Sequence, residues 1–126
     1  MPALDPSVDR DFIRIRLADP DTLLVACLCA DWCRVCRKYR LPFNQLAQTY
    51  PSACLVWIDI ETYGDWLDGY EVEDFPTLLL QRAGRTYFFG PVSPRAAILA
   101  RMLADLNSLP AASSAPDLRC ALCLDI

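Results

Sequence analysis

Two almost uninterrupted apolar segments, residues 22–30 and 54–60, stand out in the first half of the chain. Apolar runs of this length without regular polar alternation are typical of strands buried on both faces of a sheet. Between them, residues 33–47 combine basic and apolar side chains at a spacing that predicts a helix with one solvated side, kinked at Pro42. Strand, crossover helix and strand together predict a parallel, right-handed βαβ unit.

Further elements are expected before and after this unit. Residues 8–18 have a roughly helical apolar spacing, residues 77–81 and 85–89 are two strands around a turn, and residues 94–106 form a last amphipathic helix. The pattern predicts an α/β domain over residues 1–110, with a central sheet flanked by helices. Residues 111–116 are rich in alanine, serine and proline, so residues 111–126 are expected to form a flexible C-terminal tail.

Composition narrows the class of protein. With 126 residues, 54% hydrophobic and 22% charged, the chain has the content of one packed domain rather than a disordered segment. The net charge of −4 argues against nucleic acid as the partner. No apolar run approaches the roughly 20 residues of a membrane helix, so no membrane partner is expected. The first residues lack the basic and apolar regions of a signal peptide, and we expect a cytoplasmic protein.

Two of the seven cysteines carry the candidate chemistry. Cys33 and Cys36 stand three apart, where the first strand gives way to the helix. At the start of a helix, unpaired N–H groups and the positive end of the dipole stabilise a thiolate at Cys33, and Cys36 lies one turn further in. We therefore predict that Cys33 is the nucleophile and Cys36 the resolving thiol. A zinc site would need about two further ligands, and the chain has no histidine, so no metal is expected.

Two separated motifs resemble the thioredoxin family over about residues 22–106: Ala-Asp-Trp-Cys-Arg-Val-Cys at 30–36, and Phe-Pro-Thr-Leu-Leu-Leu at 75–80, followed by Ala83-Gly84 and Gly90. The resemblance implies a thioredoxin-like fold with a central mixed β-sheet. It also implies a thiol–disulfide oxidoreductase that acts on protein disulfide or dithiol substrates, needs no bound cofactor and is recycled by a reductase or by glutathione. In the family the proline matching Pro76 is cis. The residues expected to line the substrate groove are Trp32, Arg34, Val35, Phe75, Pro76 and Gly90.

Two departures from the family pattern concern the dithiol. Cys27 takes the place of a buried aspartate that exchanges protons with the resolving cysteine, and the lysine paired with that aspartate aligns near Leu55. Cys27 is expected to be a small core residue, and Cys36 to lose its proton to solvent or substrate. Arg34 and Val35 replace the family's Gly-Pro between the cysteines. A cation beside the thiolate favours the reduced form, so we expect a dithiol more oxidising than that of thioredoxin.

The remaining cysteines leave alternatives open. Cys29 and Cys54 are expected to be core or edge residues. Cys120 and Cys123 form a second Cys-x-x-Cys, which is a possible auxiliary dithiol able to reach Cys33, a metal clip, or an ordinary tail. Two alternatives to the enzyme also stand: a binding module or chaperone-like adaptor with weak redox activity, and a metal-handling protein that uses both cysteine pairs.

Overall fold

The computed structural model describes residues 3–70, 72–110, 112 and 114–123 of the chain. The helices are α1 (Pro6–Leu17), α2 (Arg34–Thr49), α3 (Ile60–Tyr63), α4 (Ala96–Ala104) and α5 (Leu118–Cys123), with short 3-10 turns at Gly64–Leu67 and Leu106–Ser108. The strands are β1 (Leu24–Cys29), β2 (Cys54–Asp59), β3 (Thr77–Arg82) and β4 (Arg85–Pro91). Among these residues, no helix is both long enough and apolar enough to span a bilayer.

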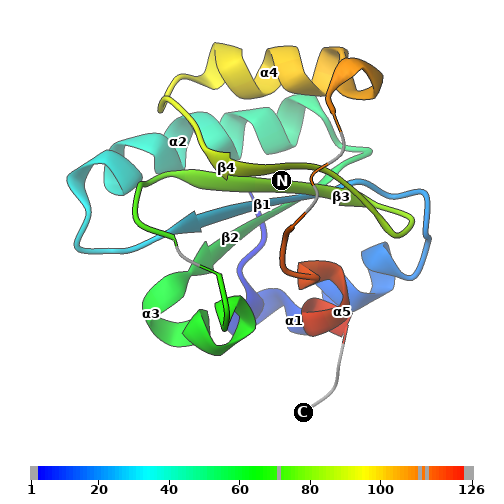
Figure 1. Ribbon diagram of the computed structural model, residues 1–126, viewed down its shortest axis with the longest axis horizontal. Helices are drawn as coiled ribbons and strands as arrows, with labels where there is room; N and C mark the ends of the chain where they lie inside the picture. The colour runs from blue at the N-terminus through cyan, green and yellow to red at the C-terminus, as the bar shows by residue number, and fades with distance from the viewer. Residues whose placement is uncertain (1–2, 71, 111, 113, 124–126) are drawn as a thin grey trace.

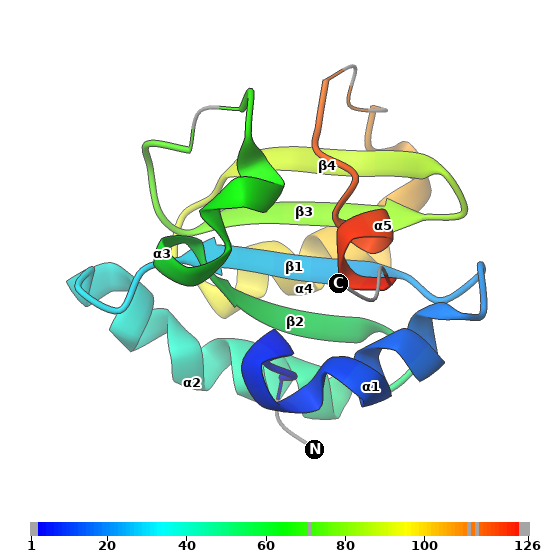
Figure 2. The ribbon, with the colours of Figure 1, turned by 90° about the horizontal axis from the view of Figure 1, so that it is seen from below.

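The four strands form one mixed sheet in the order β2-β1-β3-β4. β1 and β2 are parallel, as the predicted βαβ unit requires, and β3 is antiparallel to both β1 and β4. Helices α2 and α4 cover one face of the sheet, and α1, α3 and α5 cover the other (Figures 1 and 2). The predicted α/β architecture, a central mixed sheet flanked by helices, is confirmed.

Strand β1 is the centre of the core, and all six of its residues are fully buried. Because successive side chains of a strand point to opposite faces, Val25, Cys27 and Cys29 belong to the core under α2 and α4. Leu24, Ala26 and Leu28 belong to the core under α1 and α5. Coverage of both faces explains why this segment of the sequence lacks polar alternation.

Helix α2 presents one apolar side to the sheet. Its buried residues are Cys36, Tyr39, Phe43 and Leu46, spaced three, four and three apart as on one side of a helix. Pro42 lies inside the helix, which continues past it to Thr49. The helix thus begins directly after Cys33 and buries Cys36 within its first turn.

The described part of the C-terminal segment is packed, where the composition predicts a flexible tail. Leu118 and Leu122 of α5 are fully buried in the core that also contains residues of α1. Arg119 donates hydrogen bonds to the carbonyls of Leu17 (2.8 Å) and Thr22 (2.6 Å). An apolar pair four residues apart is one side of a helical turn, and α1 together with the sheet provides the surface that covers it. Residues 114–123 are therefore an integral part of the domain.

Candidate active site

The turn between β1 and α2 places Cys33 at the start of the helix. Cys33 N–H donates to the carbonyl of Ala30 (3.1 Å), and the carbonyl of Cys33 accepts from Arg37 N–H (3.1 Å). Cys33 is thus the N-cap of α2, and its side chain makes no capping hydrogen bond. The thiol is free and half-buried. This is the position at the positive end of the helix dipole that the sequence predicts.

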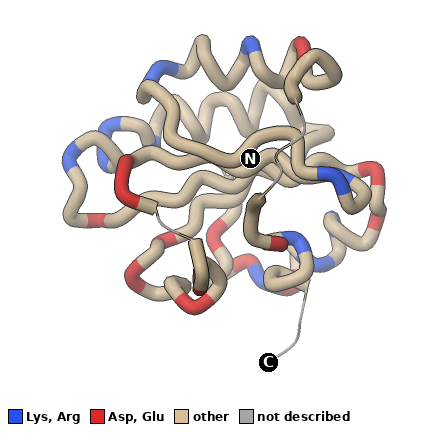
Figure 3. The backbone as a smooth tube through the Cα atoms, in the orientation of Figure 1, with Lys and Arg blue, Asp and Glu red and all other residues tan. Residues whose placement is uncertain are grey.

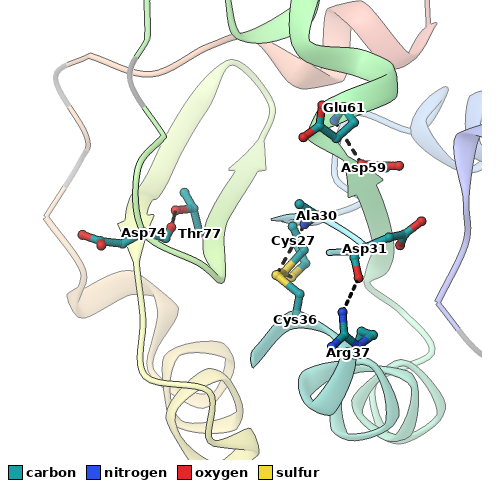
Figure 4. Close-up of a disulfide and its surroundings, with 10 residues drawn as sticks. Cys27, Ala30, Asp31, Cys36, Arg37, Asp59, Glu61, Asp74 and Thr77 are labelled. Atoms are coloured by element: carbon teal, nitrogen blue, oxygen red, sulfur yellow. Dashed lines mark hydrogen bonds between the residues drawn. A yellow bond between two sulfur atoms is a disulfide. The ribbon is translucent and has the colours of Figure 1, made fainter. Parts of the chain in front are cut away.

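Cys36 is bonded to Cys29, not to Cys33. The disulfide joins the last residue of β1 to the first turn of α2, with the two Cα atoms 5.7 Å apart (Figure 4). Ala30 N–H also points to the sulfur of Cys36 (3.4 Å). The pairing differs from the predicted Cys33–Cys36 disulfide because Cys29 faces α2 from the end of the strand. The catalytic roles of Cys33 and Cys36 stay predictions.

Cys27 lies directly beneath this disulfide. Its sulfur is 3.8 Å from that of Cys29, two residues along the same side of β1, and its side chain is fully buried. The expectation that Cys27 is a core residue is confirmed. Burial raises the pKa of the Cys27 thiol far above its ordinary value, and the positive charge of Arg40 opposes that effect only in part. The position at which the resemblance implies a buried aspartate therefore holds a neutral thiol.

Two aromatic side chains complete the layer around Cys27. The Tyr39 hydroxyl is buried and has no hydrogen-bond partner among the described residues. Burial, with a smaller contribution from Cys27, raises the pKa of Tyr39. The Arg40 guanidinium lies over the ring of Trp57, 4.7 Å from its centre. A pocket of about 160 Å³, lined by Cys36 together with Arg40 and Trp57 among others, opens beside the disulfide.

Exposed apolar side chains stand on either side of Cys33. Trp32 is 62% exposed, and Val35 is 38% exposed. The Trp32 ring meets Phe75 edge-on at 5.7 Å, and its indole N–H donates to Glu61 Oε1 (2.6 Å). The predicted groove residues Trp32 and Phe75 are therefore in contact, and Cys33 itself packs against the same core as Phe75.

The remaining predicted groove residues include one that is buried, one that is exposed on α2 and one that lies in the sheet. The Phe75–Pro76 peptide bond is cis, and Pro76 is buried, with its carbonyl accepting from Val92 N–H (3.0 Å). Arg34 is exposed in the first turn of α2. Gly90 pairs with Leu78 in the sheet and borders a pocket of about 180 Å³ next to the segment that precedes β3.

Near the turn that carries Cys33, positive and negative side chains lie on two different segments. Basic residues gather at the start of α2, and acidic residues lie on the segment before β3 (Figure 3). Arg37 is fixed by a hydrogen bond from its guanidinium to the carbonyl of Asp31 (2.7 Å), which holds the turn against the helix (Figure 4). A partner that reaches Cys33 therefore meets cations on the helix side of the thiol.

The remaining cysteines lie away from this turn. Cys54 opens β2 and is fully buried, and burial raises the pKa of its thiol to about 11. Cys120 and Cys123 are exposed on α5, which lies on the sheet face opposite α2 and close to the start of β1 (Figure 2). This placement does not bring them to Cys33. Within the part of the chain that the structure describes, no three histidine, cysteine or acidic side chains gather as a metal site would require.

Sequence reasoning missed Cys29 and Glu61. Strand periodicity already places Cys29 on the same face as Cys27, and its place as the last strand residue brings it to the helix that begins five residues later. That signal could have suggested a contact with the first turn of α2. Glu61 has no such signal, because its contact with Trp32 depends on how the turn between β1 and α2 lies relative to helix α3.

Comparison with known proteins agrees with this geometry. The Thioredoxin family model matches residues 7–103. A protein from Arabidopsis thaliana described as a thioredoxin H10 is 35% identical over 63 residues, which cover 50% of this chain and 41% of that protein. Thioredoxin-1 of Saccharomyces cerevisiae is 32% identical over 65 residues, 52% of this chain and 63% of that protein. The match thus spans less than two thirds of either relative.

A solved structure extends the likeness to most of the chain. The germline-specific thioredoxin Deadhead of Drosophila melanogaster superimposes with a TM-score of 0.68 at 28% identity, covering 84% of this chain and 99% of that one. The matched family model takes in the sheet, helix α2 and the cysteine-bearing turn. On these grounds the chain belongs to the thioredoxin family.

Proposed function

We propose that this protein is a protein-disulfide oxidoreductase whose attacking group is Cys33. The observation that carries the proposal is the arrangement of two sulfurs: a free, half-buried thiol at the N-cap of α2, and a buried Cys36 one turn further in that already takes part in a disulfide. The N-terminus of a helix favours the thiolate, which is the reactive form. Cys36 follows Cys33 by three residues in the first turn of the helix, a spacing at which one thiol can resolve a bond made at the other.

The reaction is an exchange of two electrons between dithiols. The Cys33 thiolate attacks one sulfur of a substrate disulfide, forms a mixed disulfide and releases the first substrate thiolate. Cys36 then attacks the Cys33 sulfur and releases the second substrate thiolate, so that the substrate is reduced and the protein oxidised. The N–H of Ala30 points to the Cys36 sulfur and supports negative charge there. With Cys27 neutral, the Cys36 proton goes to solvent or to the departing substrate thiolate.

The surface around Cys33 fits a polypeptide substrate. Trp32 and Val35 are exposed apolar side chains next to the attacking sulfur, and Trp32 is held edge-on against Phe75. These side chains can contact an extended polypeptide on both sides of its disulfide, whereas a small thiol compound would contact few of them. The recycling partner in this proposal is a reductase or glutathione, and the place of action is the cytoplasm.

A turnover assay tests the proposal. Wild-type protein is expected to accelerate the reduction of insulin disulfides by dithiothreitol, and Cys33→Ser to fall to the rate of dithiothreitol alone. Cys120→Ser is the matched control, because Cys120 is an exposed free thiol on the opposite face of the sheet. Wild-type protein with no acceleration would contradict the proposal and favour an adaptor that binds through Trp32 and Phe75.

A further inference from the structure

We propose that Cys29 is a third redox cysteine. It displaces Cys33 from the disulfide with Cys36, so that the oxidised protein contains a buried Cys29–Cys36 disulfide. The inference rests on the proposed function of Cys33 and deepens it. It follows from one juxtaposition: the Cys29 and Cys36 sulfurs are bonded, while Cys33 is left as a free thiol at the surface. An active site that contained only Cys33 and Cys36 could not transfer its disulfide, because there would be no third sulfur to bond with Cys36.

The fold brings three sulfurs together under the first turn of α2. Cys29 and Cys36 are joined, and the Cys27 sulfur follows at 3.8 Å from that of Cys29. All three side chains are buried, Cys27 and Cys29 completely and Cys36 to within 1%. Cys36 is thus bonded to the fully buried Cys29 and stands in the first turn of α2, three residues after the half-buried Cys33 at the N-cap. It can exchange bonds with either of them.

The transfer is a thiol–disulfide exchange within the protein. After a substrate has been reduced, Cys33 and Cys36 share a disulfide. The Cys29 thiol loses its proton and attacks the Cys36 sulfur, the Cys29–Cys36 bond forms, and the Cys33–Cys36 bond breaks. Cys33 leaves as a thiolate and takes up a proton. No external oxidant or reductant is consumed, because one thiol and one disulfide stand on each side of the reaction.

Burial gives the inner disulfide a distinct reactivity. An external thiol must approach a disulfide sulfur in line, and Cys29 and Cys36 offer almost no exposed surface, even with the pocket beside Cys36. Reduction then requires Cys33 to attack Cys36 first and so return the bond to the surface. In oxidised wild-type protein, Cys33 is expected to remain free and open to alkylation. In a Cys33→Ser variant, the Cys29–Cys36 disulfide is expected to resist dithiothreitol as long as the protein stays folded.

Disulfide mapping tests the transfer directly. The protein is oxidised with a slight excess of oxidised glutathione, quenched in acid, and its free thiols are blocked with N-ethylmaleimide under denaturing conditions. Trypsin and endoproteinase Asp-N then separate the cysteines of this region into three peptides, residues 21–30, 31–34 and 35–37, which we call the strand, turn and helix peptides. The expected product in wild-type protein is a strand–helix link, with Cys33 of the turn peptide blocked by the maleimide.

Matched variants identify the strand cysteine. Cys27→Ala and Cys29→Ala each remove one buried thiol from the same side of β1. Cys27→Ala should keep the strand–helix link, whereas Cys29→Ala should shift the link to turn–helix and protect Cys33 from alkylation. Cys29→Ser serves as a second variant of similar size if alanine impairs folding, which circular dichroism monitors.

Two results would overturn the inference, and they differ in what they leave standing. A turn–helix link as the sole product in wild-type protein would remove the role of Cys29 and leave Cys33 and Cys36 as the active pair. If the strand–helix link persists in Cys29→Ala but is lost in Cys27→Ala, the bond to Cys36 is made by Cys27 and not by Cys29. Failure of the proposed function itself is recognised separately, by absence of insulin turnover in wild-type protein.

Discussion

Replacing Tyr39 by phenylalanine is expected to stabilise the protein. Tyr39 is 1% exposed, and its hydroxyl is buried with no hydrogen-bond partner among the described residues. Most substitutions in a core destabilise, so the sign of this prediction is informative. The residue lies in the layer beneath the Cys29–Cys36 disulfide, next to Cys27, and the variant therefore reports on whether that layer is dry and apolar.

The magnitude follows from the cost of an unpaired polar group. A buried hydroxyl without a partner loses its hydration at a cost of about 1–3 kcal/mol. Tyr39→Phe keeps the ring and its packing on Phe43, 6.0 Å between centres, and leaves a void of one oxygen atom. Because that void forfeits some dispersion contact, we expect the lower end of the range: a gain of about 1 kcal/mol, or roughly 3–5 °C in Tm for a domain of this size.

Urea unfolding followed by tryptophan fluorescence in the presence of a reductant measures this gain without a contribution from disulfides. Tyr63→Phe is the control, because the Tyr63 hydroxyl shares an exposed hydrogen bond with Ser7 Oγ (2.9 Å), and its loss is expected to change the free energy of unfolding by less than about 0.5 kcal/mol. A loss of about 1 kcal/mol or more in Tyr39→Phe would refute the reasoning. It would mean that the hydroxyl has a partner, such as an enclosed water, and that the layer is polar.

Three further predictions concern the C-terminal helix, the buried thiols and the surface beside Cys33. Leu118→Ala should lower the free energy of unfolding by about 2–5 kcal/mol, because the side chain is fully buried, whereas the 64%-exposed Leu41 should tolerate alanine; urea titration of both variants decides it. The Cys54 thiol has its pKa raised from 9.0 to about 11 in the folded state, so its stabilisation is complete below pH 9.0 and lost as pH rises towards 11. Unfolding free energies measured from pH 8 to 11 should fall in that window by up to about 1.4 kcal/mol per pH unit for this group, and Cys54→Ala should flatten the fall; an unchanged slope would contradict it. Trp32→Ala should reduce kcat/KM for a protein disulfide about tenfold, because the proposed function assigns the exposed ring to the surface that covers the substrate chain. The alkylation rate of Cys33 by iodoacetamide should stay within twofold; equal losses in both assays would argue for a structural role.

The sequence predicts best those elements whose pattern of apolar residues follows from which of their faces are covered by neighbouring helices or by the sheet. β1 is apolar throughout, and β2 is apolar as far as Ile58, because helices cover both faces of the sheet. α2 carries one apolar side because only that side is covered. The N-cap position of Cys33 is also local, since it depends only on where the strand ends and the helix begins. These features could be predicted because each is decided within a few residues.

The features that escaped prediction depend on contacts between distant segments. Helix α5 has only Leu118 and Leu122 as buried residues, and it is held by Arg119 against carbonyls about 100 residues earlier in the chain. A short apolar pair after an Ala-Ser-Pro segment does not reveal such an anchor. The bond from Cys29 to Cys36 likewise depends on how the end of β1 faces α2, which a cysteine count cannot show.

An equilibrium redox titration in dithiothreitol and glutathione buffers would show directly whether these cysteines form a redox centre. The folded protein is equilibrated in each buffer and quenched in acid, and its free cysteines are then counted by alkylation under denaturing conditions, because Cys29 and Cys36 are buried in the native state. We predict one two-electron transition, in which two thiols disappear together. For the Cys33–Cys36 disulfide the expected midpoint lies between about −270 and −120 mV, because Arg34 beside Cys33 favours the reduced form of that pair. Cys36→Ala should abolish that transition, since Cys36 belongs to either disulfide. If wild-type protein equilibrated in the folded state gives the same number of free thiols after denaturation across the whole range, these cysteines do not form a working redox centre.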